Sequence, residues 1–205
     1  MDIGNKILEA MINRFACKLY KDQKISDKDL NLILESGRYT PTSFGLEGWH
    51  FHVVEDKKLI KELTEACFDQ ESVLTAPVSI ILTALRDDYQ LDSPFVIQRG
   101  ERFPGTLQEF IDDYRGYYEY LIENNRVECW SRSQCYIAAG NMMSIAASLD
   151  IQSCAIEGFD EKMVADVIKL DLNRWQVALV IPFGYSAEPK RIKIREPLEK
   201  LVTYH

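Results

Sequence analysis

Two apolar stretches of the chain constrain its fold more than any other feature. One is VSIILT, over 78–83, and the other is QVALVIP, which begins at Gln176. Neither shows the alternation of apolar and polar residues that is typical of a half-buried strand. Uninterrupted apolar strands occur where helices cover both faces of a sheet. The chain therefore predicts an α+β sandwich with these two strands near its centre.

The other elements follow from residue type and periodicity. Clusters of β-branched and aromatic residues predict strands over 49–54, 78–83, 153–156 and 176–181. Helical periodicity predicts helices over 3–13, 27–38, 56–67, 105–124, 130–149 and 161–169. Ser26 and Asp160 can cap the second and the last of these helices. The helix over 130–149 is small or apolar almost all round, so we expect it at the centre of the fold or in a subunit interface.

Length and charge limit the functions that are open to the chain. Its 205 residues contain no repeat, low-complexity segment or linker, which indicates a single domain over 1–205. The formal net charge of −8 argues against a nucleic-acid partner and against an anionic membrane surface, because each phosphate contact requires a cation. Any phosphate-binding site must therefore be local.

The cysteines favour a reducing compartment. They are odd in number, scattered, and never in a C-x-x-C arrangement, which disfavours a disulfide framework and a zinc site. The N-terminal segment has no apolar stretch long enough for a secretory signal, and the most apolar run, 135–149, is too short to cross a bilayer. We therefore expect a cytoplasmic protein without a metal site. The cysteines are Cys17, Cys67, Cys129, Cys135 and Cys154.

The segment 187–205 differs in kind from the rest of the chain. It contains two prolines, four cations within 190–195 and a final apolar LEKLV, with little that could close a helix on its own core. Such a segment either frays or wraps another molecule, and a partner subunit is the natural candidate. We expect a C-terminal extension that wraps the partner.

Two pairs of cations could form an anion site. Arg14 and Lys18 are four residues apart, and Lys193 and Arg195 have the spacing that puts alternate strand residues on one side. From the residues alone, a solvated basic surface is the simpler interpretation of each pair, and a binding site remains the alternative.

Five segments, taken in order, resemble the nitroreductase family of FMN enzymes. RFACKLY resembles the family's opening R-x-S-x-R/K-x-F/Y signature, and PTSFGLEGWHFHVVED resembles its following P-S-x-x-N-x-Q-P-W-x-F-x-V-V segment. WSRSQCYIAAGN is similar to the long interface helix, AIEGFD to the turn of the oxygen-insensitive branch, and IPFGYSAEPKRIKIR to the closing segment. Each motif is weak alone, but five in the family's order indicate membership.

The resemblance implies a fold, an activity and partners. The fold is a three-layer sandwich whose mostly antiparallel sheet is flanked by helices, in an intertwined homodimer with an FMN at each of two interface sites. The activity is that of an NAD(P)H-dependent nitroreductase-type oxidoreductase. Hydride would pass from NADH or NADPH through flavin N5 to a nitroaromatic, quinone or similar flat acceptor in two half-reactions. The alternatives are a related FMN enzyme, such as a flavin reductase or dehalogenase, and a non-catalytic flavin-binding protein.

The resemblance also implies which residues hold the cofactor. Arg14, Lys193 and Arg195 match the phosphate-binding positions, so we expect them to converge, and Lys18 matches the position that reaches the N1/O2 edge of the flavin. Ser43 matches a residue that touches the flavin across the interface, and the turn at Glu157 matches one whose backbone lies near N5/O4. No catalytic acid or base is required. The complete predicted set is Arg14, Phe15, Ala16, Lys18, Pro41, Thr42, Ser43, Gly45, Asp69, Ser72, Ile156, Glu157, Gly158, Lys193 and Arg195.

The chain departs from the family pattern at several of these positions. Ala16 stands where relatives carry a phosphate-bonding serine. Gly45, Glu47 and Gly48 replace Asn, Gln and Pro, which we expect to loosen the loop. Asp69 and Ser72 align with an asparagine and a lysine that contact the flavin ring, and the lost positive charge predicts a lower flavin potential than in lysine-bearing relatives.

The remaining aromatic and imidazole residues leave alternatives open. The aromatics within 85–128 either line a slot for the acceptor or pack inward, and both interpretations fit the sequence. We interpret Trp49 and Trp130 as core aromatics, and His50 and His52 as strand residues that face opposite sides. Cys17 has no histidine near it in sequence, so we do not expect it to act as a nucleophile.

Overall fold

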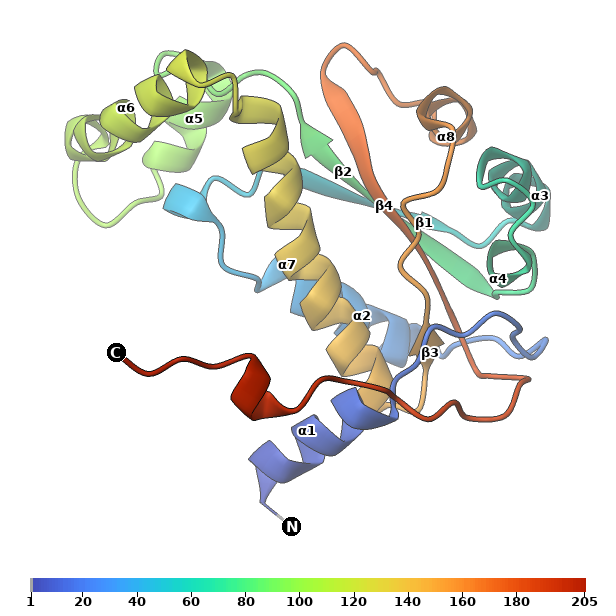
Figure 1. Ribbon diagram of the computed structural model, residues 1–205. Helices are drawn as coiled ribbons and strands as arrows, with labels where there is room; N and C mark the ends of the chain where they lie inside the picture. The colour runs from blue at the N-terminus through green and yellow to red at the C-terminus, as the bar shows by residue number, and fades with distance from the viewer. Residues whose placement is uncertain (1) are drawn as a thin grey trace.

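The computed structural model describes residues 2–205, which form helical layers on both sides of a four-stranded sheet (Figure 1). The strands are β1 (Trp49–Val54), β2 (Val78–Leu85), β3 (Gln152–Ser153) and β4 (Trp175–Gly184). They lie in the order β1-β2-β4-β3, and all three pairings are antiparallel. The four predicted strands are present. The third is shorter than predicted, because after Ser153 the chain touches β4 again only through a bridge between Ile156 and Val180.

Helices account for most of the remaining regular structure. They are α1 (Ile3–Asn13), α2 (Asp27–Arg38), α3 (Lys57–Ala66), α4 (Glu71–Leu74), α5 (Pro94–Gly100), α6 (Leu107–Glu123), α7 (Val127–Ser148) and α8 (Glu161–Ile168). Two 3₁₀ turns cover Ser43–Gly45 and Leu198–Lys200. The sequence missed α4 and α5, since one or two turns are too short to show a helical period. Ser26 and Asp160 cap α2 and α8 as predicted.

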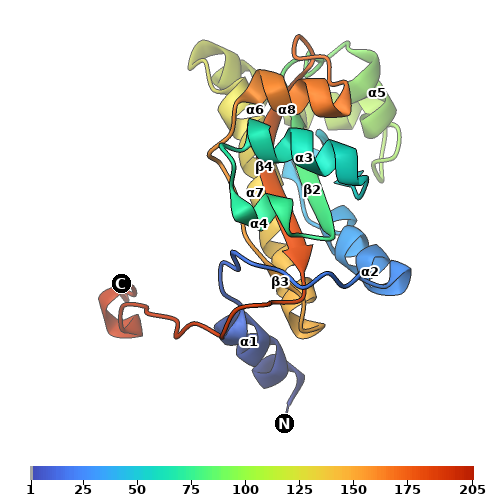
Figure 2. The same ribbon diagram turned by 90° about the vertical axis from the view of Figure 1, so that its right-hand side faces the viewer.

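The central strands are covered on both faces, which confirms the prediction from their uninterrupted apolar sequences. Ile80 and Leu82 pack with α2 and α7, whereas Ile81 between them packs with α3 and α8. The same alternation holds in β4, where Val180 belongs to the α3–α8 side. Figure 2 shows α3, α4 and α8 in front of the sheet and α7 behind it. The fold is therefore a three-layer sandwich.

A third apolar cluster lies where α5 and α6 meet the start of α7. Phe110 and Tyr114 are buried, and the Tyr114 hydroxyl donates to the carbonyl of Tyr89 at 2.8 Å. Tyr117 and Tyr120, from the same helix, are exposed. The aromatic side chains of α6 thus form two groups. One group packs in the core, and the other is exposed and available to a partner or a ligand.

The loop before β1 is held firmly by α5 and its neighbours. A Cβ on Gly48 would lie 1.9 Å from the Tyr89 hydroxyl, so only glycine fits there. Arg99 donates to the carbonyl of Leu46 at 3.1 Å, and Glu47 pairs with Arg102 at 3.2 Å. The expectation that Gly48 loosens this loop is therefore wrong, because the glycine permits close packing.

His50 and His52 lie on the same face of β1, and the expectation that they face opposite sides is wrong. Alternate strand residues share a face, and the two imidazole centroids are 4.7 Å apart. The Nε2 atom of His52 lies 3.3 Å from the Thr83 hydroxyl. Burial, and then the neighbouring His50, lower the pKa of His52 to about 4.

The depressed pKa of His52 predicts that acid weakens the fold. The unfolded chain binds a proton at this imidazole near pH ~6.5, whereas the folded chain binds it only near about 4. Between these values the unfolded state holds more protons, so the free energy of unfolding falls as pH falls through this window. Urea titrations at several pH values should show that the free energy of unfolding depends less steeply on pH in His52→Gln than in the wild type. His205→Gln, at the exposed C-terminus, serves as the control, and equal slopes in all three proteins would contradict the prediction.

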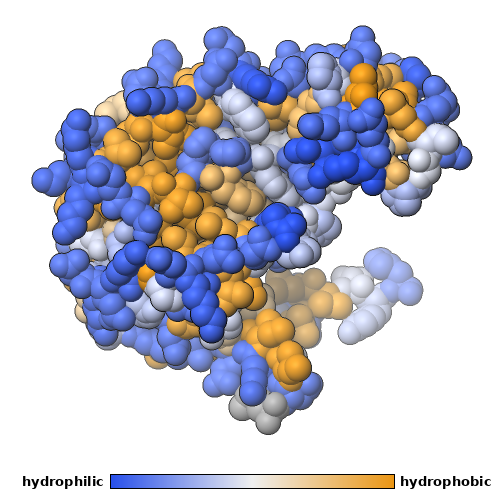
Figure 3. Space-filling view, turned by 180° about the vertical axis from the view of Figure 1, so that it is seen from behind, coloured by the Kyte–Doolittle hydropathy of each residue, from blue (hydrophilic) through white to orange (hydrophobic). Residues whose placement is uncertain are grey.

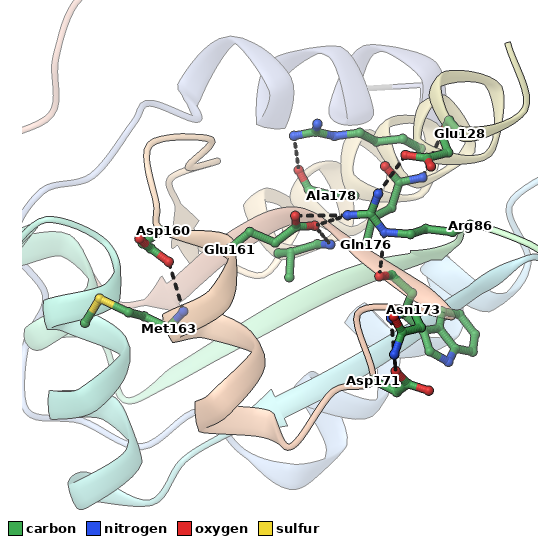
Figure 4. A network of polar contacts seen from close by, with 12 residues as sticks. Arg86, Glu128, Asp160, Glu161, Met163, Asp171, Asn173, Gln176 and Ala178 are labelled. Atoms are coloured by element: carbon green, nitrogen blue, oxygen red, sulfur yellow. Dashed lines mark hydrogen bonds and ion pairs between the residues drawn. The ribbon is translucent and has the colours of Figure 1, made fainter. Parts of the chain in front are cut away.

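An arginine beyond the end of β2 ties together three elements (Figure 4). The guanidinium of Arg86 donates to the carbonyl of Trp175 at 2.9 Å, to Glu128 of α7 at 2.7 Å and to both carboxylate oxygens of Glu161 of α8. Glu161 also accepts from the backbone N–H of Val177 at 2.9 Å. Because Arg86 is only 25% exposed, these bonds are partly shielded from water.

Replacing Arg86 by methionine is expected to lower the free energy of unfolding by about 2–3 kcal/mol, since it removes charge-assisted bonds and leaves carboxylates unpaired. Arg38→Met is the matched control, because Arg38 pairs with Glu35 and stacks on Tyr39 on the exposed surface of α2. A surface pair of that kind contributes about 0–1 kcal/mol. Urea unfolding measures both variants, and equal losses would contradict this role of Arg86.

The C-terminal segment leaves the sandwich after β4 and passes the end of α1 (Figure 1). Tyr20 and Ser186 form an antiparallel bridge, and the N–H of Ala187 donates to the carbonyl of Leu19 at 2.9 Å. Further along, most side chains lie in solvent, with Ile192 93% and Tyr204 92% exposed. Across residues 2–205, no helix combines the length and the apolar character needed to cross a bilayer.

Candidate functional site

Residues 14–20 form an extended segment between β3 and the C-terminal segment. The N–H of Phe15 donates to the Gln152 side chain at 3.1 Å, and Ala16 forms a parallel bridge with Ser153. Phe15 and Cys17 are buried, whereas Ala16 and Lys18 are exposed, as expected of alternate residues in an extended chain. Arg14 is half-buried and belongs to the outward set.

Three cations from opposite ends of the chain lie near one another. The pKa of Lys193 is lowered by burial, and then by the charges of Arg14 and Arg195. Its ammonium donates to the carbonyl of Met11 at 2.6 Å, at the end of α1. Within residues 2–205, no carboxylate forms an ion pair with any of these three cations. Cations that lie near one another without a carboxylate partner are suited to an anionic ligand.

Lys18 lies on the same extended segment as Arg14, four residues further on, and is fixed at two atoms. Its backbone N–H donates to the carboxylate of Glu188, which also accepts from Arg191. Its ammonium donates to Sγ of Cys154 at 3.1 Å. The C-terminal segment and the loop after β3 therefore both position this lysine.

The turn over 155–160 borders Lys18 on the other side. Ile156 is buried and exchanges backbone hydrogen bonds with Val180 at 2.9 and 3.1 Å. Glu157 and Gly158 are exposed, and the carboxylate of Glu157 accepts from the hydroxyl of Tyr136 on α7. A Cβ on Gly158 would meet only Gln70 and Phe68, at 3.7 and 3.9 Å. The turn thus offers an open stretch of backbone that directly follows Cys154, the hydrogen-bond partner of Lys18.

The segment before α4 joins the same region. Phe68 and Asp69 both have a φ of 56°, in the left-handed region, which is uncommon for residues with a side chain. Gln70 donates to the carbonyl of Gly158 at 3.0 Å and so connects this segment to the turn. Asp69 is exposed, whereas Ser72 is buried and its hydroxyl lacks a partner within residues 2–205. Of the two residues predicted to contact the flavin ring, Asp69 therefore faces outward and Ser72 does not.

The predicted residues of the 41–45 loop lie at the other end of α7. The N–H of Ser43 donates to Gln134 at 3.1 Å, and its hydroxyl accepts from the indole of Trp130 at 3.2 Å. Thr42 accepts from the N–H of Glu47, and Pro41 and Gly45 are exposed. The cations, by contrast, lie beside α1, which packs on the opposite part of the molecule (Figure 1). One chain therefore does not bring the two predicted groups together.

Sequence reasoning missed several residues that shape this region. Cys154, Tyr136, Gln70 and Glu188 each hydrogen-bond to a predicted site residue. Their partners are distant in sequence, so no local spacing could have revealed them. The only signal was position, because Cys154 stands directly before AIEGFD and Glu188 lies within the closing motif.

Exposed apolar side chains surround the region. No residue of α1 is buried, and Figure 3 shows the molecule hollowed between the α5–α6 end and the α1 end, where apolar side chains gather. The exposed face of α7 adds further apolar residues around Gly140, where a Cβ would meet no atom within 4 Å. The exposed apolar residues of α1 and α7 are Ile3, Ile7, Leu8, Met11, Ile12, Tyr136, Ile137 and Ile145.

Comparisons with known proteins agree on one family. The model described as "Nitroreductase family" matches residues 11–185. A protein of Staphylococcus epidermidis, provisionally named NAD(P)H nitroreductase, is 33% identical over 98% of each chain. A nitroreductase-like protein of Streptococcus mutans has a similar structure, with a TM-score of 0.86, 18% identity and full coverage of both chains. A provisionally named nitroreductase of Exiguobacterium sibiricum, solved in complex with FMN, has a TM-score of 0.77 at 17% identity and covers 97% of each chain.

Proposed function

This chain belongs to the nitroreductase family of oxidoreductases, and we propose that it uses FMN to pass hydride from NADH or NADPH to a flat acceptor such as a nitroaromatic or a quinone. The observation that carries the proposal is the group of cations formed by Arg14, Lys193 and Arg195. When bound, FMN supplies the hydride-accepting and hydride-donating chemistry, and the protein supplies binding, orientation and charge.

The cation group fits the phosphate of FMN. A phosphate monoester carries close to two negative charges and several acceptor oxygens, which guanidinium and ammonium groups bind well. In a chain with a net charge of −8, such a group must be concentrated at one place. The absence of carboxylate partners within residues 2–205 leaves these three cations available.

The neighbouring residues fit the flavin ring. Lys18 would stabilise negative charge on the reduced ring, because its ammonium donates only to a cysteine within the described residues. The exposed backbone at Glu157 and Gly158 would lie along the other ring edge, where a glycine permits close approach. Asp69 adds negative charge nearby, which supports the expectation of a lower flavin potential than in lysine-bearing relatives.

A homodimer would complete the site. Four predicted cofactor residues of one loop lie away from the cations of their own chain, namely Pro41, Thr42, Ser43 and Gly45. The apolar faces of α1 and α7 are exposed to solvent in the single chain. A second copy would supply both the loop and the cover, with the segment 187–205 wrapped around it. The five cysteines are all free thiols, which supports placement in the cytoplasm.

One set of spectra tests the proposed activity. The purified protein should take up FMN, lose its flavin absorbance under anaerobic NADH or NADPH, and regain it when a nitroaromatic or quinone is added. Re-oxidation only by free flavin or by a halogenated phenol would favour a flavin reductase or a dehalogenase. Bound FMN that neither nicotinamide reduces would indicate a non-catalytic flavin-binding protein. A protein that takes up no FMN would contradict the proposal.

A further inference from the structure

The ammonium of Lys18 has an unusual partner. Among residues 2–205, the only acceptor for its Nζ is Sγ of Cys154, at 3.1 Å. Most lysines in proteins donate to carboxylates, carbonyls or water. The neighbouring carboxylate of Glu188 is engaged by the backbone N–H of Lys18 and by Arg191 instead. The side chain of Lys18 is therefore oriented by a cysteine sulfur rather than by a carboxylate.

Cys154 is a fixed point for this contact. The residue is 3% exposed and packs in the apolar cluster between the sheet and the α3–α8 layer. Its thiol can donate to the carbonyl of Ala155, at 4.0 Å, which leaves the sulfur lone pairs for the ammonium. Because Sγ cannot move far within this cluster, it limits the positions that Nζ can take.

A neutral partner orients a cation without cancelling its charge. A carboxylate at the same place would form an ion pair and reduce the field of Lys18 at any neighbouring ligand. A thiol is a weak acceptor and leaves the remaining N–H groups of the ammonium free to donate. The pair thus combines a fixed direction with an undiminished positive charge.

We propose that Cys154 is a positioning residue that directs the ammonium of Lys18 toward the ring of bound FMN and so raises the flavin potential. This inference rests on the proposed FMN site. Cys154 itself does not exchange protons or electrons with the substrate. Its effect passes through Lys18, whose charge stabilises the reduced ring more than the oxidised ring.

The test compares the midpoint potential of bound FMN in Cys154→Ala, Cys154→Ser and Lys18→Met. Loosening Lys18 in Cys154→Ala should weaken binding of reduced relative to oxidised FMN by about three- to tenfold, which lowers the potential by about 15–30 mV for a two-electron couple. Cys154→Ser keeps an acceptor and should retain most of the wild-type potential. Cys135→Ala, which removes a buried thiol from α7, is the matched control and should leave the potential unchanged.

The double variant Lys18→Met with Cys154→Ala separates positioning from packing. If Cys154 acts through Lys18, its replacement should change the potential no further once the ammonium is gone. Additive shifts would overturn the proposal, as would a wild-type potential in Cys154→Ala with FMN bound. If Cys154→Ala does not fold, the Cys154→Ser variant provides the test. A flavin potential in Cys154→Ser as low as that in Lys18→Met would overturn the proposal. A wild-type protein that binds no FMN would instead contradict the proposed function.

Discussion

Replacing Lys193 and Arg195 together by alanine is expected to weaken FMN binding by about 10²- to 10⁴-fold, because two hydrogen bonds to charged groups contribute about 3–6 kcal/mol. Both residues lie in the C-terminal segment, and the pKa of Lys193 is lowered by burial and then by its cationic neighbours. An anion between these cations relieves their mutual repulsion. The affinity of the variant should also depend less on salt concentration than that of the wild type.

Riboflavin provides the internal comparison for this variant, since it carries the same ring as FMN without the phosphate. Its affinity should change little, and calorimetric titration of both ligands measures the difference. Lys190→Ala with Lys200→Ala is the matched control, because it removes two positive charges from the same segment. Equal losses for riboflavin and FMN, or equal losses in the control, would show that the two cations do not bind phosphate.

Placing an arginine at Gly140 is expected to dissociate the proposed homodimer, with a rise of about 10²- to 10⁴-fold in the dimer dissociation constant, since an unpaired buried charge costs about 3–5 kcal/mol. Gly140 lies on the exposed face of α7, and no atom of its own chain lies within 4 Å of the Cβ position. The monomer therefore has room for the side chain. The expected loss comes only from the partner that covers this face, and FMN should be lost with the dimer.

Gly116→Arg is the control for this experiment. Gly116 is also helical, on α6, and a Cβ there also meets no atom within 4 Å. Sedimentation measurements should show a wild-type dimer and a dimeric Gly116→Arg protein, with Gly140→Arg monomeric. A dimer of unchanged affinity in Gly140→Arg would place the subunit contact elsewhere on the surface.

Most of the fold could be predicted from the sequence, because its elements are long and regular. The helices at 3–13 and 27–38 have the predicted bounds, and both central strands lie where the uninterrupted apolar runs predicted them. The one-turn helix α4 could not be predicted, since its start follows two left-handed residues, Phe68 and Asp69, that no propensity indicates. The placement of Ile80 and Ile81 on opposite faces of the sheet could be predicted from the two-residue period of a strand alone.

The site was less accessible from the sequence than the fold. The family motifs indicated Arg14, Lys18 and the cations of the C-terminal segment, because charge and order along the chain are visible in one dimension. The contact between Lys18 and Cys154 was not visible, since it joins residues that are distant in sequence through a side chain with no charge. Packing around Gly48 was misjudged for the same reason, because the Tyr89 hydroxyl that requires a glycine comes from the connection between β2 and α5, distant in sequence.

The pairing of residues 14–20 with both Ser153 and Ser186 has a consequence for biosynthesis. On the ribosome, residues 14–20 emerge long before Ser153 and Ser186. They therefore stay unpaired in the nascent chain until these later residues are synthesised. Lys193 and Arg195 are translated later still, which means that a prematurely terminated chain cannot assemble the full set of cations. If these cations hold FMN as proposed, cofactor binding would require translation to pass them, and truncated products would bind FMN only weakly.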